Sequence, residues 1–172
     1  VWGSANTEKD EVVLKKIAEE CQGENLVLGP VEDKNHKAIG AAAMGFGHSI
    51  VASSPIDVNL AKQINILLEN LGVPTDRMLI DPTTGGLGYG LEYTYSVMER
   101  IRTAAFTGDP MLAMPMLVTP GFEVARTKES KASHTAFPFW GPEQERGALL
   151  EIATAMTLLN AAYHLTQFWD GR

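Results

Sequence analysis

The sequence predicts an α/β fold built on a parallel sheet, and three observations support this prediction. Segments of strand type and of helical type alternate along the 172-residue chain, a pattern typical of strands joined by crossover helices. The strand-type segments are near-continuous apolar runs, which indicates burial on both faces. Polar or turn-forming residues follow the strands at their C-terminal ends. A doubly wound sheet and a (β/α) barrel both fit the alternation, and the third observation favours the barrel, where such loops gather on one face.

The N-terminal half of the chain predicts three helices separated by two strands. The first helix begins at Thr7, which has the side chain of an N-cap, and its apolar residues recur at helical spacing as far as Cys21. A short apolar strand, 24–31, comes next, followed by a helix of small residues that stops at a glycine. A second strand, 48–55, ends at a proline, and a leucine-rich amphipathic stripe over 58–71 then predicts the third helix.

The C-terminal half predicts three further strands and two helices. The third strand, 77–85, ends in a glycine-rich turn, and the helix after it begins near Leu91. A fourth strand is expected at 114–121. A long helix with apolar residues at helical spacing then covers 145–163, and the apolar segment 164–169 predicts a last strand.

The expected number of strands is smaller than a complete barrel requires. We expect about five strands, whereas a (β/α) barrel closes with eight. The chain also opens with Val1 and Trp2, which resemble the end of a strand. We therefore expect residues 1–172 to form a single domain that is the C-terminal part of a longer barrel protein.

The composition argues against several classes of function. The net charge is −7 and no basic stripe is present, so a nucleic-acid partner is not expected. No apolar run reaches the length of a membrane span, and no signal-peptide pattern is recognisable. The single cysteine, Cys21, allows no disulfide within the chain and cannot hold an iron–sulfur cluster alone. We therefore expect a cytoplasmic protein that binds neither nucleic acid nor membrane.

The most informative segment is DPTTGGLGYG, residues 81–90, between the third strand and the next helix. Pro82 biases Asp81 towards an extended backbone, and the glycines permit positive φ and the close approach of another molecule. The amides that begin the following helix favour an anion or an oxygen-rich ligand. The spacing matches neither a P-loop nor a dinucleotide fingerprint. A tight turn with a structural aspartate is the alternative, but the glycines exceed what a turn requires, which favours contact with a ligand or a subunit.

Three other groups of residues have simpler interpretations. Ser53 and Ser54 close the second strand, and Ser54 or Asp57 is a natural N-cap for the next helix, which we favour over a catalytic role. The carboxylates and the histidine within 32–36 could bind a metal, but a capped, solvated helix start is the favoured interpretation. The aromatic residues of 137–140 indicate either a partner surface or local packing, and both remain open.

Two longer phrases, VASSPIDVNLAKQ at 51–63 and DPTTGGLGYGLEY at 81–93, are specific enough to indicate a family. With the sequence around them, most strongly over 1–105, they resemble the small subunit of the corrinoid/iron–sulfur protein. This family is also called the delta subunit of the acetyl-CoA decarbonylase/synthase complex. The resemblance implies a TIM barrel similar to the pterin-binding barrels of dihydropteroate synthase and methyltransferases. The expected fold is therefore α/β, a (β/α) TIM-type barrel of which this chain covers only the C-terminal part.

The resemblance also implies a role in methyl transfer. In that family the small subunit pairs with a large subunit, which supplies the iron–sulfur cluster and the main corrinoid-binding domain. The cobalt of the corrinoid carries a methyl group from a methyl-tetrahydropterin towards acetyl-CoA synthase, in the synthesis or cleavage of acetyl-CoA. The expected partners are this large subunit in a heterodimer, a methyltransferase, and the acetyl-CoA synthase/CO dehydrogenase.

The same resemblance implies which residues face the corrinoid, a cobalamin-type cofactor that sits near the C-terminal face of the barrel between the subunits. These positions are Ser53, Ser54, Asp81, Thr83, Thr84, Gly85, Gly86 and Tyr89. No catalytic residue and no metal ligand is expected here, since no Asp-x-His-x-x-Gly motif offers a histidine to cobalt. Two alternatives remain: a stand-alone pterin-binding methyltransferase barrel, with Asp81 on the pterin, and a non-catalytic scaffold subunit.

Overall fold

The strands form where short apolar runs end at proline or at polar residues. The computed structural model describes residues 1–4 and 6–169, with side chains described as far as Ala161. Within these residues three parallel strands form one sheet in the order β1, β2, β3. The strands are β1 (Val27–Val31), β2 (Ser49–Ser53) and β3 (Met78–Asp81). In this register Ser53 lies beside Asp81, so the polar ends of β2 and β3 meet at one edge.

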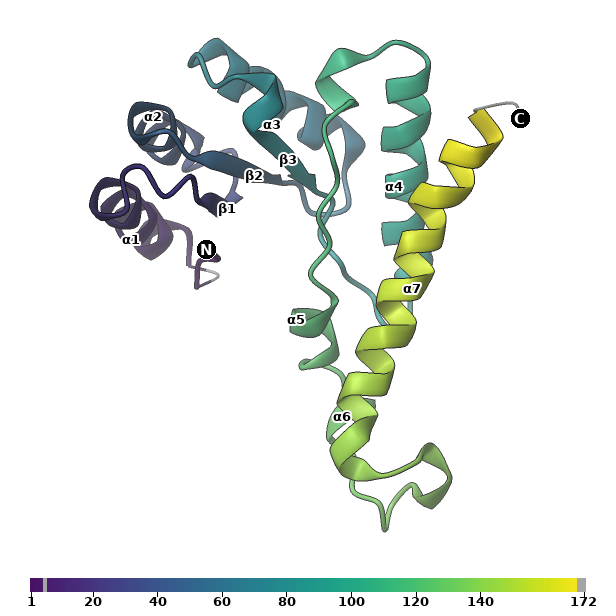
Figure 1. Cartoon of the computed structure of the whole chain (residues 1–172). Coiled ribbons are helices and arrows are strands. Elements are labelled where there is room, and N and C mark those ends of the chain that lie inside the picture. The colour runs from purple at the N-terminus through teal and green to yellow at the C-terminus, as the bar shows by residue number, and fades with distance from the viewer. Residues whose placement is uncertain (5, 170–172) are drawn as a thin grey trace.

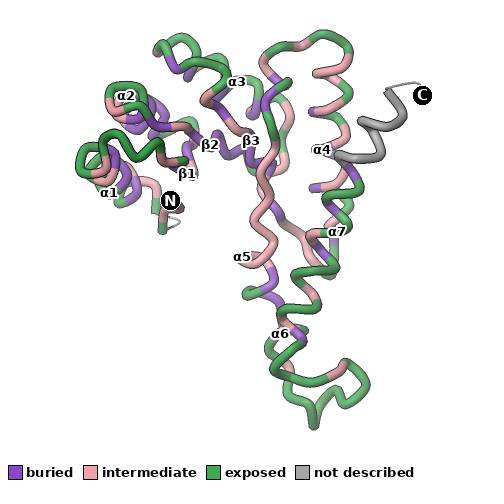
Figure 2. The backbone as a smooth tube through the Cα atoms, viewed as in Figure 1, coloured by how far each residue is buried: buried purple, intermediate pink, exposed green. Residues whose placement is uncertain are grey.

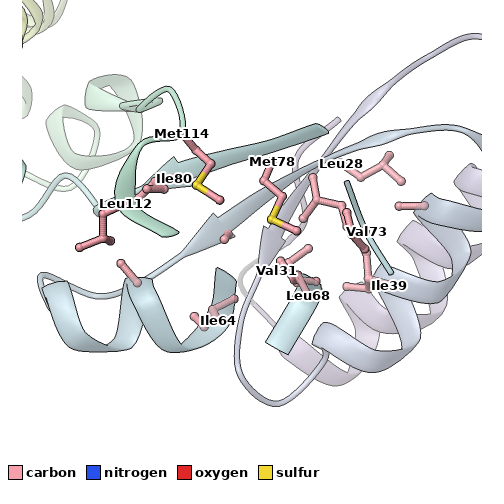
Figure 3. Packing of buried hydrophobic residues seen from close by; sticks show 14 of the residues in the cluster. Leu28, Val31, Ile39, Ile64, Leu68, Val73, Met78, Ile80, Leu112 and Met114 are labelled. Carbon is pink, nitrogen blue, oxygen red and sulfur yellow. The ribbon is translucent and has the colours of Figure 1, made fainter. Parts of the chain in front are cut away.

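Three helices lie side by side and pack on the sheet, as Figure 1 shows. They are α1 (Thr7–Glu20), α2 (His36–Phe46) and α3 (Val58–Asn70). Each buries an apolar stripe, represented by Leu14, Ile39 and Leu68, against strand residues such as Leu28 and Ile80. Figure 3 shows this packing, to which Leu112 and Met114 also contribute. These side chains form the main hydrophobic core.

The remaining helices pack largely on one another. They are α4 (Leu91–Phe106), α5 (Pro120–Val124), α6 (Lys128–Lys131) and α7 (Glu143–Trp169). Short 3₁₀ turns lie at η1 (Thr75–Arg77), η2 (Pro110–Leu112) and η3 (Pro138–Trp140). A small cluster of Met98, Leu158 and Ala161 joins α4 to α7. Figure 2 shows that exposed residues dominate the part of α7 whose burial is described. Within the described residues, no helix combines the length and the apolar character that crossing a membrane requires.

Two helix starts test the predicted capping residues. Asp57 caps α3 as expected, because one of its carboxylate oxygens accepts from the backbone N–H groups of Asn59 and Leu60 at 2.8 and 3.1 Å. The cap of α1 is one residue earlier than predicted. Asn6, not Thr7, accepts from the N–H of Lys9 at 3.1 Å.

The α/β class is confirmed, but the predicted TIM-type barrel of about five strands is wrong, because the sheet is open and three-stranded. The segment 114–121 makes only a single parallel bridge, Ile80 to Met116, rather than a strand. Prolines at 115 and 120 remove backbone donors, and Pro120 begins α5 instead. The predicted last strand, 164–169, is helical, since neither glycine nor proline interrupts α7 after Gly147.

Candidate functional site

A cavity of about 450 Å³ opens at the C-terminal ends of the strands, and we call it the strand-end cavity. Four of the predicted site residues line it: Ser53 at the end of β2, Asp81 at the end of β3, and Thr83 and Thr84 just beyond. They meet because parallel strands bring their carboxyl ends to one edge of the sheet. The structure therefore brings together half of the positions that the resemblance indicated.

Asp81 is the centre of a hydrogen-bond network in this cavity. The Ser53 hydroxyl donates to one carboxylate oxygen at 2.7 Å, and the Thr83 N–H donates to the other at 2.9 Å. The residue is only 2% exposed. Burial raises the pKa of the Asp81 carboxyl above its ordinary value, and the two hydrogen bonds only partly oppose this effect. Asp81 is thus a buried hydrogen-bond acceptor whose charge carries a desolvation cost.

Thr83 holds an unusual backbone conformation. Its φ is +63°, in the left-handed region that β-branched residues rarely adopt. Its N–H is held by Asp81, and its carbonyl oxygen accepts from the hydroxyl of Thr94 on α4 at 3.2 Å. Local strain of this kind persists only where surrounding contacts fix it, and it is common at ligand sites.

Two buried hydroxyls close to Asp81 have no hydrogen-bond partner among the described residues, those of Ser54 and Thr84. Ser54 is fully buried and does not line the cavity, and its N–H donates to the Asp81 carbonyl at 2.9 Å. Thr84 is 7% exposed and lines the cavity. Buried polar atoms are normally satisfied, so the free hydroxyl of Thr84 is a specific candidate for ligand contact.

The last three predicted positions do not line the strand-end cavity. Gly85 binds the α4 start instead, since its N–H donates to the Thr94 hydroxyl at 3.1 Å. Gly86 forms a turn with φ +75°, and its carbonyl accepts from the N–H groups of Tyr89 and Gly90. The Tyr89 side chain is 84% exposed at the edge of a second cavity of about 550 Å³. Glu123 and Arg126 line both cavities, so the two are adjacent.

Sequence reasoning missed the aromatic and charged walls of the strand-end cavity. Trp2 and Phe122 stack with ring centroids 6.3 Å apart, and both line the cavity. Glu32, Glu123 and Arg126 add three charged groups. The strand-like start of the chain was the one signal for Trp2, whereas no local pattern could place the start of α5 against it.

The side chains of residues 32–36 are not arranged as the ligands of a metal ion. The side chain of His36 is hydrogen-bonded through Nδ1 to the Asp33 carbonyl at 2.6 Å, and the Asn35 side chain accepts from the Glu32 N–H at 2.8 Å. Among residues whose side chains are described, no three His, Cys, Asp or Glu groups converge on a point. The favoured interpretation of a capped, solvated helix start is also wrong, because Asn35 at the N-cap of α2 makes no side-chain hydrogen bond to the helix and both Asn35 and His36 are buried.

The aromatic loop contains one of the two arrangements left open, local packing, whereas the partner surface stays a prediction. Phe137 and Trp140 stack on each other with centroids 4.1 Å apart, which is local packing. Phe139 is 98% exposed. The Arg146 guanidinium lies 5.9 Å from the centre of the Trp140 ring and donates to carbonyl oxygens of the loop.

The strand-end cavity therefore offers an uneven set of groups to a ligand. Its lining combines two aromatic residues with hydroxyls and a buried carboxyl from the ends of two strands. Such a wall suits a large organic molecule with apolar surface and peripheral hydrogen-bonding groups.

The amino-acid sequence of this chain is similar to those of known proteins from a single family. A family model described as CO dehydrogenase/acetyl-CoA synthase delta subunit matches residues 2–137. The acetyl-CoA decarbonylase/synthase complex subunit delta 1 of Methanosarcina thermophila is 37% identical over 169 residues, which cover 96% of this chain and 39% of that protein. The corresponding delta subunit of Archaeoglobus fulgidus is 36% identical over 169 residues, covering 96% of this chain and 37% of its own length.

A third relative is more similar over a shorter region. The delta subunit from Methanopyrus kandleri is 44% identical over 117 residues, which cover 67% of this chain and 29% of that protein. The chain thus spans well under half the length of these relatives. The matches confirm the resemblance carried by the phrases at 51–63 and 81–93, and the chain belongs to the CO dehydrogenase/acetyl-CoA synthase delta subunit family.

Proposed function

We propose that this chain is part of a corrinoid-associated methyl-carrier subunit, which passes a methyl group from a methyl-tetrahydropterin to acetyl-CoA synthase. The reaction belongs to the synthesis or cleavage of acetyl-CoA. One observation carries the proposal: Ser53, Asp81, Thr83 and Thr84 meet at a single cavity at the strand ends. Membership of the delta subunit family supplies the metabolic context.

The residues of the strand-end cavity fit one edge of a corrinoid. A cavity of about 450 Å³ is in the range that holds a drug-sized group, so a corrin ring with its side chains would enter only in part. The aromatic walls, Trp2 and Phe122, suit the apolar flank of such a ring. The unpartnered Thr84 hydroxyl suits the polar side chains at its periphery.

The residues of this chain would bind and shield rather than react. The cobalt supplies the methyl-carrying chemistry when the corrinoid is bound. Trp2 and Phe122 would exclude water from the bound face, because each presents a ring to the cavity. Asp81 holds Ser53 and the Thr83 backbone in place, so the hydroxyl wall is formed before a ligand arrives.

We further propose that the corrinoid is shared with a larger partner subunit, which holds the iron–sulfur cluster. A methyltransferase and acetyl-CoA synthase/CO dehydrogenase would act with this pair of subunits in the cytoplasm. The relatives are named as subunits of a complex, which supports an assembly of this kind. A cavity open at the strand ends leaves room for a second protein to cover the other face of the ligand.

The test is anaerobic isolation of this chain with the proteins that bind it, followed by a visible spectrum and a titration with hydroxocobalamin. We expect corrinoid and iron–sulfur absorption together with a larger, cysteine-rich partner. Thr83→Val should weaken corrinoid retention, whereas Thr103→Val, at an exposed position of α4, should not. A folded, colourless preparation that fails to bind the added corrinoid would contradict the proposal.

A further inference from the structure

Three consecutive residues before α1 line the strand-end cavity, although they belong to none of the three strands. They are Trp2, Gly3 and Ser4. The backbone of this segment is attached to β1, since Trp2 forms a bridge with Gly29 and the Gly3 N–H donates to the Gly29 carbonyl at 2.7 Å. A segment with so few backbone hydrogen bonds opens readily unless side chains also hold it. The position of the Trp2 ring in the cavity therefore depends on what else holds residues 2–4.

Asp10 on α1 provides a second attachment for this segment. One oxygen of its carboxyl group accepts from both the backbone N–H and the hydroxyl of Ser4, at 2.6 and 2.8 Å. Asp10 is 2% exposed and does not itself line the cavity. Its carboxyl group also lies directly against Gly3, because a Cβ at position 3 would be 2.5 Å from the Asp10 Cγ. The segment is thus held by a buried group that lies outside the cavity lining.

A role for Asp10 in the stability of α1 alone does not explain this arrangement, because Asn6 already caps the helix. Burial of a carboxyl group is unfavourable unless hydrogen bonds compensate it. Both hydrogen bonds that this carboxyl accepts from described residues are donated by Ser4, and no basic group among those residues forms an ion pair with it. A leucine has nearly the same shape and would fill the same space. The carboxyl group is therefore needed for its hold on Ser4.

The Trp2 ring makes two contacts that depend on this hold. It lies against β1 at Gly29, where a Cβ would come within 3.1 Å of the indole. It also stacks with Phe122, with ring centroids 6.3 Å apart. Both contacts require a fixed backbone at Trp2, and the neighbouring residues Gly3 and Ser4 fix that backbone.

We propose that Asp10 is a positioning residue of the strand-end cavity. By holding Ser4 it fixes residues 2–4 and keeps the Trp2 ring in the cavity lining before a ligand binds. The placement of the ring follows from these contacts and does not rest on the proposed function. The effect on a corrinoid does rest on the proposed function, so the two are measured separately.

The first measurement follows the motion of the Trp2 ring by time-resolved fluorescence anisotropy. It uses the full chain with the substitutions Trp140→Phe and Trp169→Phe, which leave Trp2 as the remaining one of the three tryptophans. All further variants are made in this background, so the signal reports on residue 2 alone.

Three substitutions are compared in this measurement. Asp10→Leu removes the hydrogen bonds to Ser4 and keeps the shape of the side chain, whereas Asp10→Asn keeps the accepting oxygen. Asp76→Leu, at an exposed position of η1, is the matched control. Loss of two hydrogen bonds should shift the equilibrium between the held and the released segment by about 30-fold. We therefore expect Asp10→Leu to lose anisotropy on the nanosecond timescale, while Asp10→Asn and the control keep the parent value.

The melting temperature shows whether the variants fold. Ser4 is exposed, so its freed N–H and hydroxyl can bind water in Asp10→Leu, and the melting temperature should stay close to that of the parent protein. Ser4→Ala is a second variant, which removes one of the two hydrogen bonds and leaves α1 unchanged. It should show a smaller loss of anisotropy in the same direction, whether or not Asp10→Leu folds.

The second measurement is a titration with hydroxocobalamin of the protein isolated with its partners and freed of bound corrinoid. Only molecules in which the segment is held present the Trp2 ring to the ligand. Asp10→Leu should therefore raise the dissociation constant by about threefold or more, and Asp10→Asn should restore the parent value.

The outcomes separate this inference from the proposed function. Unchanged anisotropy in both Asp10→Leu and Ser4→Ala would overturn the inference and leave the proposed function intact. A mobile Trp2 ring with unchanged hydroxocobalamin binding would also overturn it, since Asp10 would then hold the segment without serving the cavity. If Asp10→Asn releases the ring as Asp10→Leu does, the role of the accepting oxygen is wrong and the inference falls. A folded parent protein that keeps Trp2 fixed but binds no hydroxocobalamin would contradict the proposed function alone.

Discussion

The N-terminal layer, formed by β1–β3 and α1–α3, is packed very differently from the C-terminal arm, formed by α5, α6 and α7. The layer buries a continuous core in which the side chains of every strand and helix take part. Among the side chains that the structure describes, the arm contributes Leu158 and Ala161 to a small cluster with Met98 of α4. Leu149, Ile152, Met156 and Leu159 lie more than half exposed along α7. Burial of apolar area is the main stabilising term in folding, so the layer should carry most of the stability.

The strand-end cavity lies where these two regions meet. Ser53 and Asp81 come from strands of the well-packed layer, whereas Phe122, Glu123 and Arg126 come from α5 or directly follow it. The hydroxyl groups thus come from strands of the well-packed layer, whereas part of the remaining lining belongs to the region with less packing. A ligand in this cavity would contact both regions and would stabilise the arm by binding only its ordered form.

The largest expected effect on stability is that of truncating a buried leucine in the main core or in the small cluster. Leu68→Ala in α3 should lower the free energy of unfolding by about 2–5 kcal/mol, because it leaves a cavity among fully buried neighbours. Leu158→Ala in α7 should cost less, since Leu158 already borders a cavity of about 430 Å³. Urea unfolding followed by circular dichroism measures both. Equal losses would show that the arm is packed as firmly as the layer.

The second effect concerns the glycine-rich loop that joins the layer to α4. A Cβ at position 86 would lie 2.6 Å from the carbonyl carbon and oxygen of Gly90, and φ there is +75°. Gly86→Ala should therefore cost at least about 2 kcal/mol, from left-handed strain plus the clash. Gly88→Ala is the matched control, with φ +89° but open space around its Cβ. Thermal unfolding of the two variants should differ, and identical values would mean that the loop can shift.

The sequence predicted the strands of the N-terminal layer better than the segments outside it. The strands at 24–31, 48–55 and 77–85 were predictable because apolar runs ended by proline or polar residues have few alternatives. The predictions for 114–121 and 164–169 failed because short apolar runs fit either helix or strand, and the two prolines of the first segment and the uninterrupted helical sequence before the second were given too little weight. The cavity residues at strand ends followed from parallel topology, whereas Trp2 and Phe122 are brought together from segments far apart in the sequence.

The third effect is confined to the arm. Arg146 is buried and donates to the carbonyl oxygens of Ala132, Phe137, Trp140 and Gly141, which ties the aromatic loop to α7. Arg146→Met should cost about 1–2 kcal/mol, in the lower part of the range because the freed carbonyls can reach water. Hydrogen exchange should accelerate in residues 132–142, and the same substitution at exposed Arg100 should leave exchange unchanged. Uniform acceleration in the sheet would contradict this local role.

The fourth effect is a pH dependence of the layer. Burial raises the pKa of Asp81, so between the ordinary and the raised value the folded chain holds a proton that the unfolded chain has released. Its contribution to the free energy of unfolding therefore falls as pH rises through that window. Asp81→Asn removes this titration because an amide does not ionise. The amide can still donate to the Ser53 hydroxyl and accept from the Thr83 N–H. Urea unfolding at a series of acidic to neutral pH values should give a flatter slope for the variant, and an unchanged slope would refute the assignment.

The smallest effect is expected on the exposed face of α7. Ile152→Gln and Met156→Gln should each change the free energy of unfolding by no more than about 0.5 kcal/mol, because both side chains already contact water. Denaturant midpoints of the isolated chain measure this. A loss of more than about 2 kcal/mol would mean that these side chains are buried in solution, and the comparison between layer and arm would then need revision.

Gly29 in β1 has a consequence for the shape of the ligand site. A Cβ at this position would lie 2.8 Å from the Cβ of Val51 and 3.1 Å from the Trp2 indole. Even a methyl group would crowd Val51 and the indole, so at least one of these side chains would have to shift. The missing side chain at 29 therefore sets how deep the aromatic wall can sit, and an alanine there should reshape the opening without touching any polar group that a ligand would meet.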